Sequence, residues 1–147
     1  MTPEELKAKA RRFIDEVFNK RNLKHAEESL SKDFTEHSPF TPELGSGRDA
    51  AIEGFRLVID SSDDLRAEIL DLVSDGHRIA IRARYSGTDT GGYMPGVAPT
   101  GKRFEIEGID VATVDDDGNY SEHYGIPDLM TAMQQIGLAP AGPPPSA

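Results

Sequence analysis

The sequence predicts an α+β domain in which helices lie on one side of a curved antiparallel sheet. Before residue 60 apolar residues recur at helical spacing, and from Leu65 onward apolar and polar residues alternate as in half-buried strands. Turn-forming residues separate the alternating runs, which is typical of hairpins. A sheet folded around helices leaves a concavity, and we expect a ligand pocket there. The 147 residues suit one domain, expected at 1–138, with a disordered Pro-rich tail at 139–147.

The first helix is expected to begin at Pro3 and to end near Lys20. Thr2 is placed to cap it, Pro3 suits its first position, and Glu5 completes a capping box with Thr2. The apolar residues that follow share one helical face: Leu6, Ala10, Phe13, Ile14 and Val17.

Two more helices are expected at residues 22–30 and 48–59. Residues 31–46 are predicted to form the loop between them, because Pro39, Pro42 and Gly45 interrupt any regular pattern.

Four strands are predicted in the second half of the chain, at 65–73, 77–85, 104–114 and 119–126. In the second strand, alternation places Ile79 and Ile81 on one face and Arg82 and Arg84 on the other.

A loop and a short helix complete the predicted domain. Residues 87–101 are rich in Gly, Thr and Pro, and we expect them to form a ligand-covering loop that carries Tyr93 and Met94. Residues 128–136 are predicted to form a helix with Asp128 as its N-cap.

The composition excludes several kinds of function. With 26 Asp and Glu against 16 scattered Lys and Arg, the net charge of −10 disfavours nucleic acids and anionic membranes as partners. Zero cysteines exclude disulfides, thiolate catalysis and Cys-ligated metals, and no phosphate-binding loop or histidine-pair zinc motif is visible, so we expect neither cofactor nor metal. The polar N-terminus and the absence of an apolar run of 18 residues indicate a cytoplasmic protein.

Asp110 and His123 form the strongest candidate for a catalytic pair. Asp110 shares its strand face with apolar residues, and a four-residue turn at 115–118 would pair Val114 with Asn119 and set Asp110 directly opposite His123. A carboxylate and an imidazole that meet inside a cavity can act as a general acid and base near neutral pH. The alternative is a buried polar pair that only fixes the register, and a β-bulge would change the count.

Several segments, in order and spacing, resemble the SnoaL-like polyketide cyclase family of the nuclear transport factor 2-like superfamily. They are VFNKRNL (17–23), DFTEHSP (33–39), PTGKRF (99–104), GIDVATV (108–114), SEHYGIPD (121–128) and QQIG (134–137), within residues 6–138. The resemblance implies a cone of curved antiparallel sheet wrapped around the N-terminal helices, with a deep central pocket.

The resemblance also implies a cofactor-independent acid/base site that closes a polyketide ring by intramolecular aldol condensation. In such cyclases a carboxylate lies two residues after the histidine that matches His123, whereas this chain has Gly125 there. The position matching Asp110 can be a histidine in the family, so acid and base are expected to have exchanged places here.

Four further residues are expected to contact the ligand. His37, in the DFTEHSP motif, and Tyr124 would orient a substrate oxygen, while Tyr93 and Met94 would cover the pocket. The alternatives are that His37 caps backbone groups in a loop and that the tyrosines only pack.

The function expected from these features is proton transfer on a hydrophobic carbonyl compound, by cyclisation, aldol reaction or isomerisation. One alternative is a non-catalytic protein of the same fold that binds a small hydrophobic molecule. Another is an epoxide or ester hydrolase in which Asp110 and His123 activate water. By analogy with similar sheets, we expect a homodimer that pairs through the face carrying Arg82 and Arg84.

Overall fold

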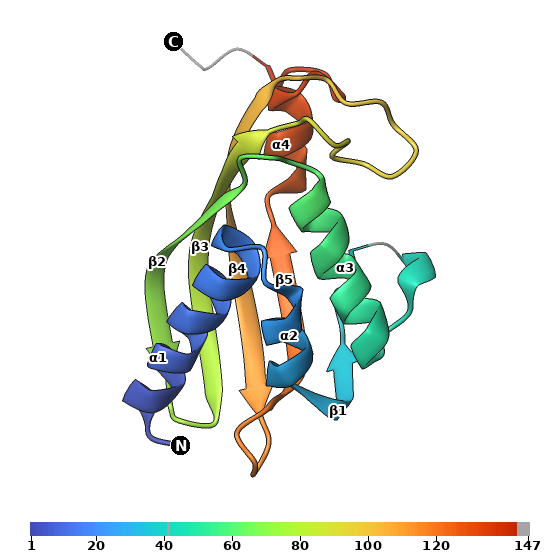
Figure 1. The fold of residues 1–147 in the computed structure, drawn as a ribbon. Coiled ribbons are helices and arrows are strands. Elements are labelled where there is room, and N and C mark those ends of the chain that lie inside the picture. Colours follow the sequence, from blue (N-terminus) through green and yellow to red (C-terminus); the bar gives the residue numbers. More distant parts are fainter. Residues whose placement is uncertain (41, 144–147) are drawn as a thin grey trace.

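The computed structural model describes residues 1–40 and 42–143, in which helices pack over one face of a five-stranded sheet (Figure 1). The helices are α1 (Pro3–Ile14), α2 (Leu23–Ser29), α3 (Arg48–Asp60) and α4 (Leu129–Gln135), with a π-helical turn at Asp15–Asn19 and a 3-10 turn at Pro42–Leu44. The strands are β1 (Leu30–Glu36), β2 (Arg66–Ser74), β3 (Arg78–Thr88), β4 (Arg103–Val114) and β5 (Tyr120–Pro127).

The strands run in the order β1-β5-β4-β3-β2. All neighbours are antiparallel except β1 and β5, which are parallel. In Figure 1, α1, α2 and α3 lie in front of the sheet, and α4 lies beyond α3 near the upper end of the sheet. This α+β architecture, with its curved open sheet, confirms the predicted fold class.

The N-terminal helix begins as predicted. The hydroxyl of Thr2 accepts a hydrogen bond from the Glu5 backbone, and the Glu5 carboxylate accepts one from the Thr2 backbone. The π-helical turn continues the helix, and Lys20 is the C-cap. Leu6, Ala10 and Val17 are completely buried, so the predicted apolar face is the face that packs on the sheet.

The predicted loop at 31–46 was partly wrong, because residues 30–36 form strand β1. The strand pairs Glu36 with His123 of β5, and the buried Phe34 and Glu36 alternate with Thr35. Exposed polar residues at 32 and 33 hide this alternation in the sequence. β1 is an edge strand of the sheet, and native edge strands commonly carry charged side chains.

The register predicted for the last hairpin was also wrong, by two residues. Asp110 pairs with Gly125, and Ala112, not Asp110, pairs with His123. Val114 pairs with Tyr120 and not with Asn119, which accounts for one residue of the shift, and a β-bulge at Ser121 adds the second. A shift of two keeps side-chain parity, so Asp110 and His123 still share the concave face as diagonal neighbours.

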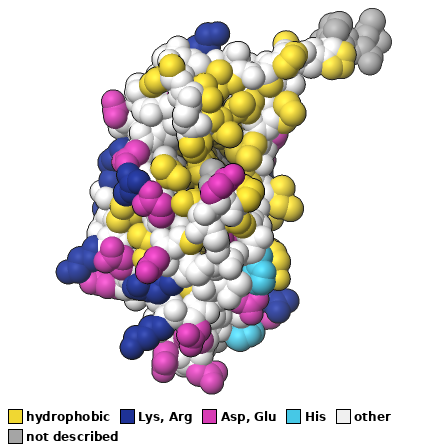
Figure 2. All heavy atoms as spheres, turned by 90° about the vertical axis from the view of Figure 1, so that its right-hand side faces the viewer, with side chains coloured by type: hydrophobic (Ala, Val, Ile, Leu, Met, Phe, Trp, Pro, Cys, Tyr) yellow, Lys and Arg dark blue, Asp and Glu magenta, His cyan; other side chains and the backbone are white. Residues whose placement is uncertain are grey.

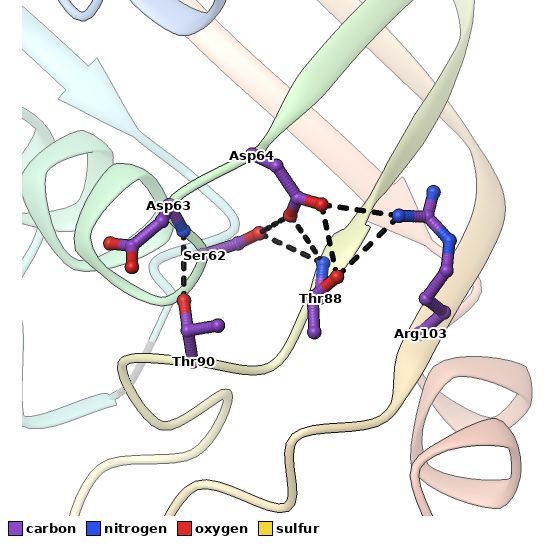
Figure 3. Close-up of polar contacts among 6 residues, drawn as sticks. All are labelled: Ser62, Asp63, Asp64, Thr88, Thr90 and Arg103. Atoms are coloured by element: carbon purple, nitrogen blue, oxygen red, sulfur yellow. Dashed lines mark hydrogen bonds and ion pairs between the residues drawn. The ribbon is translucent and has the colours of Figure 1, made fainter.

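A polar network attaches the segment after α3 to the sheet (Figure 3). Asp64 accepts hydrogen bonds from the Ser62 hydroxyl and from the backbone and hydroxyl of Thr88, and its carboxylate lies 3.1 Å from Arg103. These bonds, the backbone N–H of Thr88 foremost, lower the pKa of Asp64 to about 2. The network joins the segment that follows α3 to β3 and β4.

The C-terminal helix follows the prediction. Asp128 caps α4 by accepting a hydrogen bond from the Thr131 backbone, and Gly137 has the positive φ expected after the helix. The predicted tail at 139–147 lies partly outside the described residues, which end at 143. Within the described residues, no helix is long and apolar enough to cross a membrane.

Candidate active site

A cavity of about 330 Å³ lies between the helices and the concave face of the sheet. Its wall is mostly apolar and includes Phe13, Phe18, Phe34, Phe55, Phe104 and Ile106. Figure 2 shows hydrophobic side chains gathered on the upper half of the molecular face that carries α3 and the 89–102 loop. The size and the apolar wall are those of a site for a small hydrophobic molecule.

Three ionisable side chains in the cavity wall form one hydrogen-bonded group, which we call the Glu36–His123–Asp110 cluster. His123 Nδ1 lies 2.8 Å from Glu36 Oε2, and His123 Nε2 lies 2.9 Å from Asp110 Oδ1. The three residues come from β1, β5 and β4, which are neighbours in the sheet, and all three point to its concave face. The structure therefore brings together the predicted pair and adds a second carboxylate to it.

Glu36 is the cluster residue that sequence reasoning missed. Its side chain is 7% exposed, and it also accepts a hydrogen bond from the backbone of Ser38. In DFTEHSP, Phe34 and Glu36 are two residues apart and so share one strand face. This alternation was not recognised because the segment was predicted to be a loop.

The charges of the cluster hold a proton on His123. Burial alone would lower the pKa of His123, but the hydrogen bonds and charges of Asp110 and Glu36 outweigh burial and raise the pKa to about 9. His123 is therefore an imidazolium at neutral pH, with a carboxylate at each ring nitrogen.

Tyr85 of β3 adds a hydroxyl to the same region of the cavity. Its oxygen lies 3.4 Å from Asp110 Oδ2, a long contact that leaves the hydroxyl free to find a better acceptor. Burial, and next the charge of Asp110, raises the pKa of Tyr85 well above its ordinary value. Tyr85 is thus a neutral hydrogen-bond donor beside a carboxylate.

Gly125 provides the space in which the cluster forms. A Cβ atom at this position would lie 2.7 Å from Asp110 Oδ1 and 2.8 Å from His123 Cε1, distances too short for either contact. Because Gly125 and Asp110 are direct cross-strand partners, the Asp110 carboxylate fills the place where a side chain at 125 would begin.

Of the four residues expected to bind the ligand, only Tyr93 lines the cavity. It is buried and packs edge-on against Phe104 with ring centroids 5.1 Å apart. Met94 is partly buried against the core and is not one of the described residues that line the cavity.

His37 and Tyr124 lie away from the cavity, on the opposite face of the sheet. Their rings stack with centroids 4.1 Å apart, and His37 Nε2 lies 3.2 Å from Glu122 Oε2. The physical reason is strand alternation: each directly follows a residue that faces the cavity, Glu36 or His123, and so faces outward. The structure does not place either ring where it could orient a substrate in this cavity.

No metal site is visible among the described residues, since no three His, Asp or Glu side chains there are arranged to hold an ion.

The geometry is that of an apolar cavity with an acid–imidazole–acid cluster in its wall. The family model for SnoaL-like polyketide cyclases matches residues 8–136. The chain belongs to this family. No curated protein sequence matches the chain significantly.

Solved structures support the fold assignment of this SnoaL-like protein. TsrD from Streptomyces laurentii is 23% identical with a TM-score of 0.78, and the match covers 92% of this chain and 95% of that one. AclR from Streptomyces galilaeus, described as a candidate hydroxylase, is 20% identical with a TM-score of 0.82, over 97% and 87% of the two chains. IdmH from Streptomyces antibioticus, described as a candidate polyketide cyclase, is 25% identical with a TM-score of 0.73, over 93% and 99%.

Proposed function

We propose that this SnoaL-like protein is a cofactor-independent acid/base enzyme that abstracts a proton next to the carbonyl group of a hydrophobic compound. The observation that supports this most is the position of Asp110: a carboxylate held by a charged imidazole, beside a neutral phenol, in the wall of an apolar cavity. Such a site offers a base for a C–H group and a donor for the oxygen that becomes negative.

In the proposed reaction, Asp110 Oδ2 takes the proton from the carbon next to the carbonyl group. The electron pair of that C–H bond forms the enolate, whose oxygen accepts a hydrogen bond from Tyr85. In a cyclisation the enolate carbon then attacks a second carbonyl of the same molecule, and the new alkoxide recovers the proton from Asp110. In an isomerisation the proton returns to a different carbon, so both reactions balance without a co-reactant.

His123 and Glu36 are positioning residues in this proposal. The imidazolium N–H of His123 fixes one oxygen of Asp110 and leaves the other oxygen for the substrate. Glu36 holds the second ring nitrogen and thereby sets the orientation and charge of His123.

The test is hydrogen–deuterium exchange on 2-tetralone in heavy water, followed by NMR. The proposal expects the wild-type protein to accelerate exchange of the protons next to the carbonyl above the buffer rate, and it expects Asp110→Asn to remove the acceleration. Tyr85→Phe should retain partial activity, because the base remains while the donor is lost.

A binding protein without catalysis is the second candidate, and one observation favours it. Both ring nitrogens of His123 are already occupied by carboxylates of the cluster, as they would be in a purely structural group. Such a protein would bind 2-tetralone but leave its exchange at the buffer rate.

We also propose that two copies of the chain pair through the outer face of the sheet. Ile109 and Ile126 are direct cross-strand partners on this face, 54% and 78% exposed, and Tyr124 beside them is 49% exposed. Arg82 and Glu107, whose charged groups lie 3.3 Å apart, flank the apolar residues. A patch that carries both charges can be complementary to itself, as a two-fold interface requires.

A further inference from the structure

The cavity wall is acidic, and this has a consequence for the charge of the ligand. Among the described residues that line the cavity, the only Asp, Glu and His side chains are Glu36, Asp110 and His123, and none is Lys or Arg. Lys9 approaches from outside: its ammonium lies over the ring of Tyr120, 5.0 Å from the centroid, but Lys9 does not line the cavity.

The geometry of the cluster sets its total charge. A neutral imidazole has one N–H and one lone pair, so it cannot donate to two carboxylates at once. Because carboxylate oxygens lie 2.8 and 2.9 Å from the two nitrogens of His123, the cluster holds two protons between three groups. Wherever those protons reside, the cluster carries one net negative charge.

This charge acts in a poorly solvated place. Glu36 is 7% exposed, Asp110 21% and His123 23%, and most of the surrounding wall is apolar. Charges that water screens weakly interact strongly, and an anion entering the cavity would lose its own hydration without gaining a cationic partner.

We propose that the cavity selects uncharged hydrophobic ligands and rejects their carboxylate analogues. The substrate of the proposed reaction is then a compound whose acidic groups are absent or masked before it reaches this protein. The inference rests on the proposed function only in placing the ligand in the cavity, since it concerns binding and needs no catalytic step.

The test compares two probes of nearly equal shape, 2-naphthamide and 2-naphthoate, by isothermal titration calorimetry at pH 7. We expect the wild-type protein to bind the amide more than about tenfold more tightly, because like charges placed together in a buried site repel each other strongly. Equal affinities, tighter binding of the carboxylate, or no binding of either probe would overturn the proposal.

Charge-neutralising variants assign the selectivity to the cluster. Glu36→Gln and Asp110→Asn should each reduce the preference for the amide, because each removes one carboxylate from the wall. Glu122→Gln is the matched control, since it removes the same charge from the outer face, where Glu122 is 48% exposed beside His37. If Glu122→Gln lowered the preference as much as Glu36→Gln does, the effect would come from net charge and not from the cavity.

The outcomes separate this inference from the proposed function. Retained preference for the amide with no deuterium exchange on 2-tetralone would overturn proton abstraction and leave the selectivity. Deuterium exchange on 2-tetralone with equal binding of the two naphthyl probes would overturn the charge selectivity and leave proton abstraction.

Discussion

The two faces of the sheet carry the same pair of residue types in opposite surroundings. On the concave face Glu36 of β1 contacts His123 of β5, and on the outer face His37, the residue directly after β1, contacts Glu122 of β5. The inner pair is 7% and 23% exposed with atoms 2.8 Å apart, while the outer pair is 33% and 48% exposed at 3.2 Å.

The difference between the faces comes from one step along each strand. Adjacent strand residues point to opposite faces, so two Glu-His dipeptides on neighbouring parallel strands produce one buried and one exposed pair. Of the two pairs, the buried one also contacts a second carboxylate, that of Asp110, whereas the outer pair stacks on Tyr124 and is weakened by water. The same residue types therefore make a candidate catalytic cluster on one face and a surface contact on the other.

The largest expected effect is on catalytic activity, which should depend on the concave face of the sheet and not on the outer face. Asp110→Asn should slow exchange of 2-tetralone by about a hundredfold or more, since it removes the base. Glu122→Gln and Tyr124→Phe, which alter only the outer face, should leave the rate within about twofold. The measurement is the exchange rate by NMR in heavy water. An equal loss of rate in the concave-face and outer-face variants would contradict the assignment of the cavity as the site.

The next effect is on stability at alkaline pH. The pKa of His123 is raised to about 9 in the folded protein from 6.5, so the cluster's contribution is complete below about pH 6.5 and is lost as pH rises through 9. That contribution is on the order of 3 kcal/mol. Urea unfolding between pH 6 and 10 should show this decline in the wild-type protein.

Two variants at the histidines make this alkaline test specific. His123→Gln should remove most of the decline in stability, while His37→Gln should preserve it. A decline that persists in His123→Gln would show that other groups cause it.

Gly125→Ala should disturb the inner cluster without unfolding the chain. The added methyl group would collide with Asp110 Oδ1 and the His123 ring, both of which are side-chain atoms that can move. Loss of the Asp110 hydrogen bond should lower the pKa of His123, which NMR titration of the histidine ring measures.

Gly54→Ala is the control for this substitution. Gly54 lies in α3 and lines the cavity, but among the described residues a Cβ there would meet Phe40 and Leu44 alone, at ordinary contact distance. It should leave the pKa of His123 unchanged, and an unchanged value in Gly125→Ala as well would show that Gly125 is not needed for the cluster.

A smaller effect tests the outer face. Ile126→Lys should shift the proposed dimer towards monomer in analytical ultracentrifugation, because it places a charge in the apolar patch that is 78% exposed in the single chain. Met130→Lys, at an exposed site on α4, is the control and should not change the mass. A wild-type monomer would refute the pairing.

The smallest effect lies outside both faces, in the network of Figure 3. The pKa of Asp64 is lowered from 3.8 to about 2, so its stabilising contribution is present above about pH 3.8 and is lost as pH falls through 2. Asp64→Asn should lower the melting temperature at pH 6, with a difference from wild type that shrinks towards pH 2. A constant difference would mean that the charge of Asp64 is unimportant.

Particular residues show how far the sequence predicted this structure. Thr2, Pro3 and Glu5 located the first helix, and alternation located four of the five strands, because these signals depend on neighbours a few residues apart. Strand β1 was not predicted, because it is stabilised by pairing with β5, some 90 residues later, and has no clear alternating pattern of its own.

The candidate site was predicted in part for a related reason. Strand alternation predicted that Asp110 and His123 share one face of the sheet. This prediction holds although the register was wrong by two residues, because an even shift leaves each side chain on the same face. Glu36 was missed, and His37 was preferred to it, because the face of a strand residue is undefined until the strand itself is known.

The sequence by itself determined the local features: the helix caps, the alternating faces, the acidic balance and the presence of glycine at 125. Only the tertiary structure decided that three strands bring two carboxylates to one imidazole, and that the Asp110 carboxylate occupies the space left by Gly125. The physical reason is that capping and alternation act over a few residues, whereas the charge of His123 depends on groups that only folding of the sheet places within 3 Å of its ring.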